Sequence, residues 1–105
     1  MIDVTAGLIF RNGRLLLTQR PQGKQYAGFW EMPGGKRKLG ETLSDCLVRE
    51  LQEELRITVH VHQLLKIYVH DQQPVSLKLH FFLCSLDANQ EHQILLLQFL
   101  LLAYI

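Results

Sequence analysis

The chain has 105 residues, of which 48% are hydrophobic and 20% charged, and its formal net charge is +1 at pH 7. This composition excludes intrinsic disorder and fibrous repeats, and the length predicts one domain, residues 1–105, with room for a single site. With this balanced charge, we expect no extended electropositive surface that would bind a nucleic acid polymer or a membrane. Two cysteines and the lack of a signal-peptide pattern predict a reducing, cytoplasmic setting.

The first forty residues predict strands and loops. Residues 4–10 and 15–19 are rich in β-forming residues, and Asn12-Gly13 between them predicts a tight hairpin because both residues tolerate positive φ. Residues 21–40 contain five glycines and two prolines. This density predicts a loop-rich segment around a short strand at residues 29–32.

The clearest helix of the sequence follows. Thr42 and Asp45 have the spacing of an N-terminal cap, and leucines recur at positions 43, 47, 51 and 55, which gives an apolar stripe. Strands are expected at residues 57–69, with an irregularity at Gln63, and at residues 75–86, with a turn between them. This order predicts an α/β protein of the mixed α+β kind, in which a helix packs on a mixed sheet.

Carboxylates gather on the other face of this helix. Glu50 stands three and four residues before Glu53 and Glu54, so all three are neighbours on the helix surface. Like charges at this spacing destabilise a helix by about 0.2–0.5 kcal/mol per pair, and a divalent cation would offset that cost. Such a cluster suits Mg²⁺ or Mn²⁺ rather than zinc, whereas a solvated face is the simpler interpretation of the glutamates alone.

A longer pattern surrounds these carboxylates. Gly35 is followed after five residues by Glu41, and after seven more by Arg-Glu-Leu-Gln-Glu-Glu-Leu-Arg-Ile at residues 49–57. The pattern resembles the signature of the Nudix hydrolases, Gly-x5-Glu-x7-Arg-Glu-U-x-Glu-Glu-x-Gly-U, where U is bulky and apolar. Only the second glycine differs, being Arg56 here. Residues 26–35 are similar to the opening of MutT-like members, which remove oxidised nucleotides.

The resemblance implies a Nudix-type α/β/α sandwich and a hydrolase dependent on Mg²⁺, with Mn²⁺ as an alternative cofactor. It implies that the metal ligands are three helix carboxylates and one backbone carbonyl, those of Glu50, Glu53, Glu54 and Gly34. Glu41 and Arg49 would orient this cluster, and Glu91 would serve as a late metal ligand or general base. The implied reaction is hydrolysis of a nucleoside triphosphate to the monophosphate and pyrophosphate, with 8-oxo-dGTP as the leading substrate.

Three further residues are candidates for substrate binding. Arg20 either clamps a phosphate or a base edge with its planar guanidinium, or ends a strand in solvent. Lys36 opens a basic triplet near the expected polyphosphate, although a solvated loop is the favoured interpretation of the triplet. Trp30, with Tyr26 and Phe29, either stacks on a base or packs in the core.

The end of the chain departs from the family pattern. Residues 94–105 contain one polar residue, Gln98, so we expect an atypical or truncated C-terminal element that is a core segment or a homodimer surface. We also expect Arg56 to end the helix differently from the family glycine, which suits a left-handed cap.

The alternative function is a nucleotide-binding module with little or no catalysis. The expected partner is a nucleoside triphosphate, with no nucleic acid polymer and no membrane.

Overall fold

The computed structural model describes residues 1–20, 22–23, 26–88 and 99–101, the last three for their backbone alone. The elements in these ranges are eight strands and one helix. They are β1 (Ile2–Arg11), β2 (Arg14–Leu16), β3 (Thr18–Gln19), β4 (Trp30–Glu31), β5 (Gly34–Lys36), α1 (Leu43–Leu55), β6 (Val59–Gln72), β7 (Val75–Leu86) and β8 (Phe99–Leu101).

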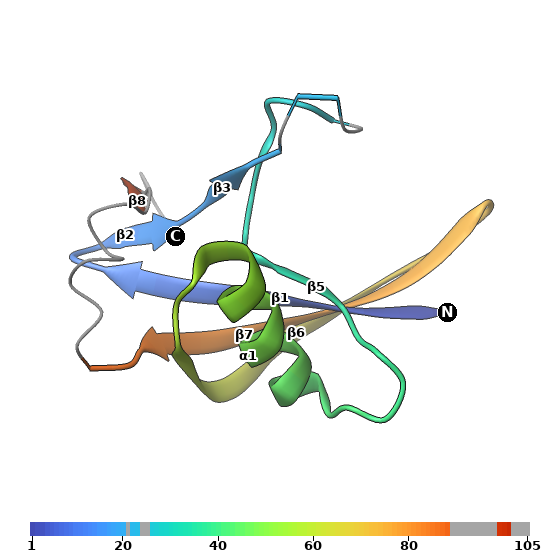
Figure 1. The fold of residues 1–105 in the computed structure, drawn as a ribbon. Coiled ribbons are helices and arrows are strands. Elements are labelled where there is room, and N and C mark those ends of the chain that lie inside the picture. The colour runs from blue at the N-terminus through green and yellow to red at the C-terminus, as the bar shows by residue number, and fades with distance from the viewer. Residues whose placement is uncertain (21, 24–25, 89–98, 102–105) are drawn as a thin grey trace.

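The main sheet is mixed, and β1 lies at its centre. Its strand order is β6-β7-β1-β2-β8, and β5 pairs with the N-terminal half of β1. Strands β1 and β7 are parallel, whereas the other pairs of this sheet are antiparallel. Strands β3 and β4 form a separate ribbon that projects from the sheet, while α1 lies across one face (Figure 1). The predicted mixed α+β class is confirmed, with one helix among the described residues.

The alternation of side chains along β1 and β7 gives the sheet two different faces. Cross-strand partners share a face, and one set packs against α1, namely Thr5 with His80, Gly7 with Phe82 and Ile9 with Cys84. The intervening residues, including Val4 with Leu79 and Ala6 with Phe81, lie on the opposite face. The same two strands therefore build the core on one side and leave an apolar surface on the other.

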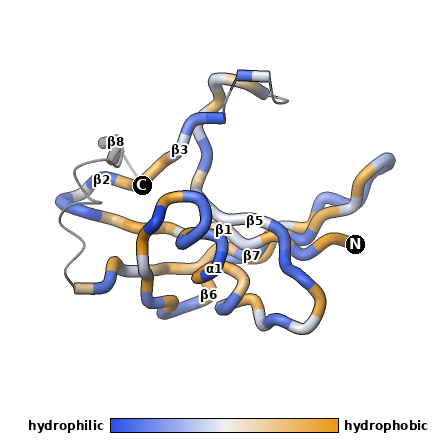
Figure 2. Tube along the Cα trace, viewed as in Figure 1, coloured by the Kyte–Doolittle hydropathy of each residue, from blue (hydrophilic) through white to orange (hydrophobic). Residues whose placement is uncertain are grey.

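Helix α1 supplies much of the core, as its apolar stripe predicts. Hydrophobic residues recur along the helix (Figure 2), and Leu47 and Leu51 are fully buried against the sheet while Leu43 and Leu55 pack at the margin. The side chain of Thr42 accepts a hydrogen bond of 3.1 Å from the backbone N–H of Asp45, so the predicted N-cap is confirmed. The cap satisfies an N–H group that has no partner inside the helix.

The predicted strands are found with altered limits. The hairpin at Asn12-Gly13 is confirmed, since both residues have positive φ, but the next strand is divided into β2 and β3. Strand β4 covers only two of the four residues expected around Trp30, because the glycine-rich loop occupies the rest. Strands β6 and β7 form a long hairpin whose register shifts on either side of Gln63 and Leu64, which confirms the predicted irregularity.

The expectation for Arg56 is wrong. It adopts the left-handed conformation, with φ of 58° and ψ of 36°. Its backbone N–H donates to the Gln52 carbonyl at 3.0 Å, and that of Ile57 donates to the Leu51 carbonyl at 3.5 Å. The helix therefore ends in the geometry that the family glycine suits, and the hydrogen bond from Arg56 satisfies the Gln52 carbonyl, which has no partner within the helix. An L-residue adopts this conformation at a cost of about 1–2 kcal/mol.

Part of the C-terminal segment forms a strand. Strand β8 pairs antiparallel with β2 at the edge of the sheet, so at least this part of residues 94–105 extends the sheet. The rest of that segment lies outside the described residues. Within the described ranges, no helix is long and apolar enough to cross a bilayer.

Arg56→Gly should stabilise the fold by about 0.5–1 kcal/mol, because glycine adopts positive φ without a Cβ penalty. Urea unfolding would measure the gain, with Arg56→Ala as the matched control. Alanine keeps the Cβ and loses the charge, so it should give no gain. Equal stabilisation by both variants would show that the charge, and not the backbone, is the source of the cost.

Candidate active site

Arg49 lies at the centre of the charged face of α1. Its Nη2 lies 2.6 Å and its Nε 3.0 Å from the two carboxylate oxygens of Glu41, and its Nη2 also donates to the carbonyl of Lys36. Its Nη1 donates to Glu50 at 2.9 Å and to Glu53 at 3.3 Å. One guanidinium thus connects the loop before α1 to two of the helix carboxylates, and both orienting residues expected from the sequence are brought together.

The pair of Glu41 and Arg49 shifts the pKa of both groups. Hydrogen bonds from Arg49, together with the backbone N–H of Lys38, lower the pKa of Glu41 from its ordinary 4.5 to about 2. The hydrogen bonds to Glu41, and then that to Glu50, raise the pKa of Arg49. Both groups therefore keep their charges over the whole physiological pH range.

The glycine pair before this loop lies directly against the carboxylates. A Cβ on Gly35 would overlap the Glu50 carboxylate, and a Cβ on Gly34 would overlap the backbone of Thr5. The Thr5 hydroxyl donates to the Gly35 carbonyl at 3.3 Å, and the backbone N–H of Gly7 donates to the Pro33 carbonyl at 2.8 Å. The loop backbone can therefore approach β1 at Gly34 and α1 at Gly35 only because both residues lack a side chain.

Glu54 extends the acidic face toward β4. Partial burial raises the pKa of Glu54, and the charges of Glu50 and Glu31 add to that rise, while the backbone N–H of Gly34 and the guanidinium of Arg20 oppose it. A carboxylate in this position is destabilised by its acidic neighbours, and a bound cation would relieve the repulsion.

The donor set fits a hard divalent cation. Within the described part of the chain, no three His, Cys, Asp or Glu side chains converge closely enough to form a metal cage. Arg49 instead lies between the carboxylates of Glu50 and Glu53. Mg²⁺ needs few protein ligands, because it retains several waters and binds phosphate oxygens of the substrate. Carboxylates that repel one another are suitable ligands for such an ion.

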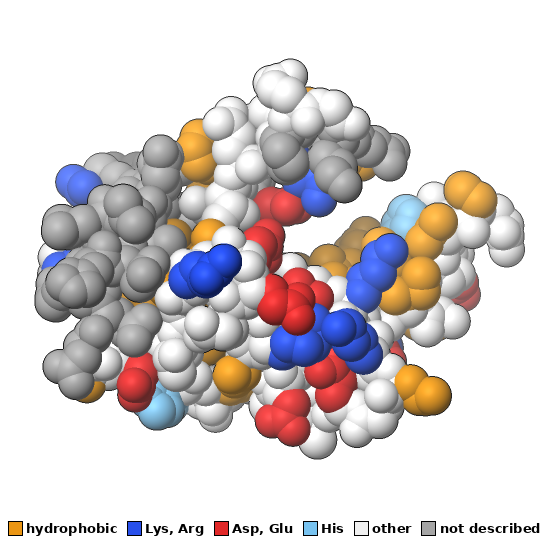
Figure 3. All heavy atoms as spheres, viewed as in Figure 1, with side chains coloured by type: hydrophobic (Ala, Val, Ile, Leu, Met, Phe, Trp, Pro, Cys, Tyr) orange, Lys and Arg blue, Asp and Glu red, His pale blue; other side chains and the backbone are white. Residues whose placement is uncertain are grey.

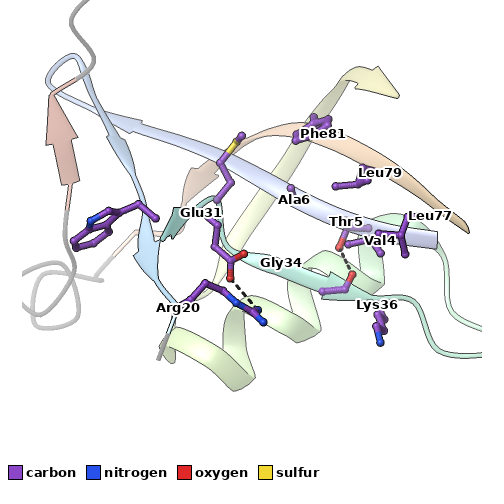
Figure 4. A pocket seen from close by; sticks show the side chains of 13 residues that line it. Val4, Thr5, Ala6, Arg20, Glu31, Gly34, Lys36, Leu77, Leu79 and Phe81 are labelled. Carbon is purple, nitrogen blue, oxygen red and sulfur yellow. Dashed lines mark hydrogen bonds and ion pairs between the residues drawn. The ribbon is translucent and has the colours of Figure 1, made fainter. Parts of the chain in front are cut away.

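A pocket of about 530 Å³ lies beside this acidic face. Its floor is the outer face of the sheet, where Ala6, Leu79 and Phe81 project (Figure 4). Arg20 and Glu31 form an ion pair of 3.4 Å at its margin, where their side chains point toward one another. Acidic and basic side chains surround a hollow in the molecular surface (Figure 3). The pocket thus combines an apolar floor with a charged margin.

The structure places the three substrate-binding candidates on this pocket. Arg20, Trp30 and Lys36 all line it. The core alternative for the aromatic residues is wrong, because Trp30 is 42% exposed, and Tyr26 and Phe29 are 63% and 66% exposed. Glu91 lies outside the described residues.

The sequence pattern did not single out Glu31 and Thr5 as parts of the site. Glu31 pairs with Arg20 and lies close enough to affect Glu54, although its position beside Trp30 in the loop-rich segment was a usable signal. Thr5 is almost fully buried and holds the glycine loop. Its role depends on a contact across 30 residues of chain, which no local pattern reveals.

The mixed sheet, the carboxylate-bearing helix and the pocket beside it match a known family of proteins. The NUDIX domain model matches residues 1–98. The 8-oxo-dGTP diphosphatase of Proteus vulgaris is 40% identical over 90 residues, which are 85% of this chain and 80% of that protein. The CTP pyrophosphohydrolase of Escherichia coli K12 is 49% identical over 61 residues, but these are 58% of this chain and only 45% of that protein.

Solved structures agree with these sequence relationships. The solution structure of the E. coli ORF135 protein superposes with a TM-score of 0.71 at 36% identity, covering 86% of this chain and 68% of that one. The MutT Nudix hydrolase from Burkholderia pseudomallei superposes with a TM-score of 0.71 at 29% identity, covering 80% of this chain and 66% of that one. The chain belongs to the Nudix family. It is MutT-like, within a class of hydrolases acting on diphosphate linkages of nucleotides.

The two glycines should respond differently to alanine. Gly34→Ala should destabilise the fold by about 1–3 kcal/mol, because its Cβ meets backbone that cannot move aside. Gly35→Ala should cost less than about 1 kcal/mol, because it meets only the flexible end of Glu50. It should nevertheless weaken Mn²⁺ binding about tenfold by displacing that carboxylate. Urea unfolding and Mn²⁺ titration would test both, and equal destabilisation would contradict this difference.

The Glu41 pair should make stability depend on pH. Since the pKa of Glu41 is lower in the folded chain, its contribution is present above about pH 4.5 and is lost as the pH falls toward 2. The difference in unfolding free energy between the wild type and Glu41→Gln should therefore shrink between neutral pH and about pH 3. A difference that does not change over this range would exclude the ion pair as its source.

Proposed function

We propose that the chain is a Mg²⁺-dependent nucleoside triphosphate pyrophosphohydrolase that converts an oxidised purine nucleotide such as 8-oxo-dGTP to its monophosphate and pyrophosphate. The observation that carries this proposal is the pocket whose charged margin lies beside the acidic face of α1. The name of the P. vulgaris relative supports the oxidised purine, and that of the E. coli relative supports the same cleavage on another base.

The ligands proposed for the cation are the carboxylates of Glu50, Glu53 and Glu54 and the backbone carbonyl of Gly34. A divalent cation held there would supply neutralisation of polyphosphate charge and a water of lowered pKa, and the reaction would add that water across the bridging P–O bond to give the monophosphate and pyrophosphate. Mn²⁺ has the same preference for oxygen ligands and is the alternative ion. Glu91 is kept as a further ligand or general base.

The other charged residues of the site would hold the ligands and the phosphates. Arg49 fixes the direction of Glu50 and Glu53, and Glu41 in turn fixes Arg49. Lys36 and Arg20 line the pocket at its charged end, where a polyphosphate leading from the base to the carboxylates would pass. Cationic side chains at this position would attract the substrate and stabilise charge on the departing pyrophosphate.

The apolar part of the pocket would receive the base. The side chains of Leu77, Leu79 and Phe81 provide a flat, uncharged floor, and the half-exposed Trp30 lines the same pocket. Base rings bind such surfaces through their faces, which all bases share. This arrangement favours a nucleotide over an inorganic polyphosphate.

The location and partners follow from the same chemistry. We place the enzyme in the cytoplasm, where a nucleotide hydrolase meets its substrate, with no nucleic acid polymer and no membrane as partners. A homodimer through the apolar residues 94–105 stays a prediction, which light scattering would test.

The alternative is a binding module that holds nucleotide and metal with little or no turnover. It is favoured by the Arg49 guanidinium, which lies between two of the proposed ligands. Thermal stabilisation by Mg²⁺ and nucleotide without product would support it.

Glu53→Gln should reduce hydrolysis by about 100-fold or more, because a lost metal carboxylate removes several kcal/mol of transition-state stabilisation. The assay is release of monophosphate and pyrophosphate from 8-oxo-dGTP, dGTP and CTP, with and without Mg²⁺. Asp45→Asn removes the same charge in the first turn of α1, away from these ligands, and should leave the rate unchanged.

Mg²⁺-dependent turnover that Glu53→Gln abolishes would establish the hydrolase, and the preferred nucleotide would define the pocket. A folded chain that binds Mg²⁺ and nucleotide but releases no product would support the binding module instead. Turnover that does not require a divalent cation would contradict both.

A further inference from the structure

A buried histidine lies beneath the charged face of α1. His80 is 4% exposed and stands beside Thr5 on the sheet face that packs against the helix. Its Nε2 lies 3.0 Å from Oδ1 of Asp3, and its Nδ1 has no partner among the described residues. A buried imidazole with only one of its two nitrogens hydrogen-bonded contributes little to the stability of the fold. Its contact with Asp3 therefore suggests another role.

Asp3 connects this histidine to the loop before α1. Its Oδ2 lies 3.3 Å from Nη2 of Arg37, and its backbone carbonyl accepts from the Arg37 N–H at 2.9 Å. The hydrogen bond from His80, and then that from Arg37, lower the pKa of Asp3, so this carboxylate stays charged at neutral pH. Asp3 thus ties β7 and the start of β1 to Arg37.

Arg37 continues the connection to the site. Its Nη1 donates to the backbone carbonyl of Glu41 at 3.3 Å, and the Glu41 carboxylate holds Arg49. Arg49 in turn contacts Glu50 and Glu53. A series of contacts of 2.6–3.3 Å therefore runs from the buried histidine to two of the proposed metal ligands.

The position of Arg49 decides how available those ligands are. Its guanidinium and a divalent cation compete for the carboxylates of Glu50 and Glu53, because both are attracted to the same oxygens. Glu41 draws the guanidinium toward the loop through two of its nitrogens. At present only Nη1 contacts Glu50 and Glu53. A loop that moved away would free Nε and Nη2 to join it, and the cation would then have to displace more hydrogen bonds.

We propose that Asp3 and His80 are positioning residues for metal binding, which act through Arg37 to hold the Glu41 loop and so limit the contact of Arg49 with the helix carboxylates to its Nη1. The inference rests on the proposed function, because it needs a divalent cation at Glu50 and Glu53. Neither residue touches substrate or metal. Both belong to the supporting network, whose disruption changes metal affinity.

The test is Mn²⁺ titration of the full chain by calorimetry, with unfolding measured in parallel. Asp3→Asn should raise the Mn²⁺ dissociation constant about five- to tenfold. Arg37→Gln breaks the same series at a partly exposed residue, so it should fold normally and give a similar rise. Asp71→Asn removes the same charge on the β6–β7 hairpin, where Asp71 contacts Ser76, and should leave Mn²⁺ affinity unchanged.

A double variant with Asp3→Asn and Arg37→Gln tests whether the two residues affect Mn²⁺ affinity through the same series of contacts. The double variant should bind Mn²⁺ about as well as either single variant, because each interrupts one series of contacts. The half-saturating Mg²⁺ concentration for hydrolysis should rise in parallel. Wild-type affinity in folded Asp3→Asn and Arg37→Gln chains would overturn this inference alone. A wild-type chain that binds no Mn²⁺ would overturn it together with the proposed function.

Discussion

The contact between Glu41 and Arg49 is the interaction on which the rest of the site depends. A planar guanidinium presents its donors in a fixed fork, so one side chain can hold a loop carboxylate with Nε and Nη2 while Nη1 reaches two helix carboxylates. Without this fork, Glu50, Glu53 and Glu54 would be a set of mutually repelling charges on a solvated helix. The ion pair converts that unfavourable local arrangement into an oriented one, because it fixes the loop and the helix relative to each other.

A second constraint is the close approach of the loop backbone to α1. A Cβ on Gly34 would overlap the Thr5 backbone, and a Cβ on Gly35 would overlap the Glu50 carboxylate. The same short segment pairs with β1 and leads from Glu31 at the pocket margin to Lys36 beside Arg49. This segment therefore connects the margin of the pocket with the acidic face of α1. Side chains along β1 and β7 alternate between the two faces of the sheet, so one face of these strands builds the core and the other forms the pocket floor.

Local pattern was sufficient wherever a short-range interaction decides the structure. The Asn12-Gly13 turn, the Thr42 cap and the leucine stripe each depend on contacts within a few residues, and each was predicted correctly. Arg56 shows where such reasoning fails. The propensity of arginine argues against a left-handed cap, yet the packing of α1 and Ile57 into the core fixes the chain there and outweighs a local cost of about 1–2 kcal/mol.

The sequence by itself determined the mixed α+β class, the helix, and the spacing that puts three carboxylates and Arg49 on one helix face, because helical periodicity converts spacing directly into neighbourhood. Only the tertiary structure decided which residues support that face. Glu31, Thr5, Asp3 and His80 join the site through contacts between strands and loops far apart in the chain, such as the 77 residues that separate His80 from Asp3. It also decided that Trp30 faces a pocket rather than the core. Burial of an individual side chain depends on which segments meet in the folded chain, and no local pattern contains that information.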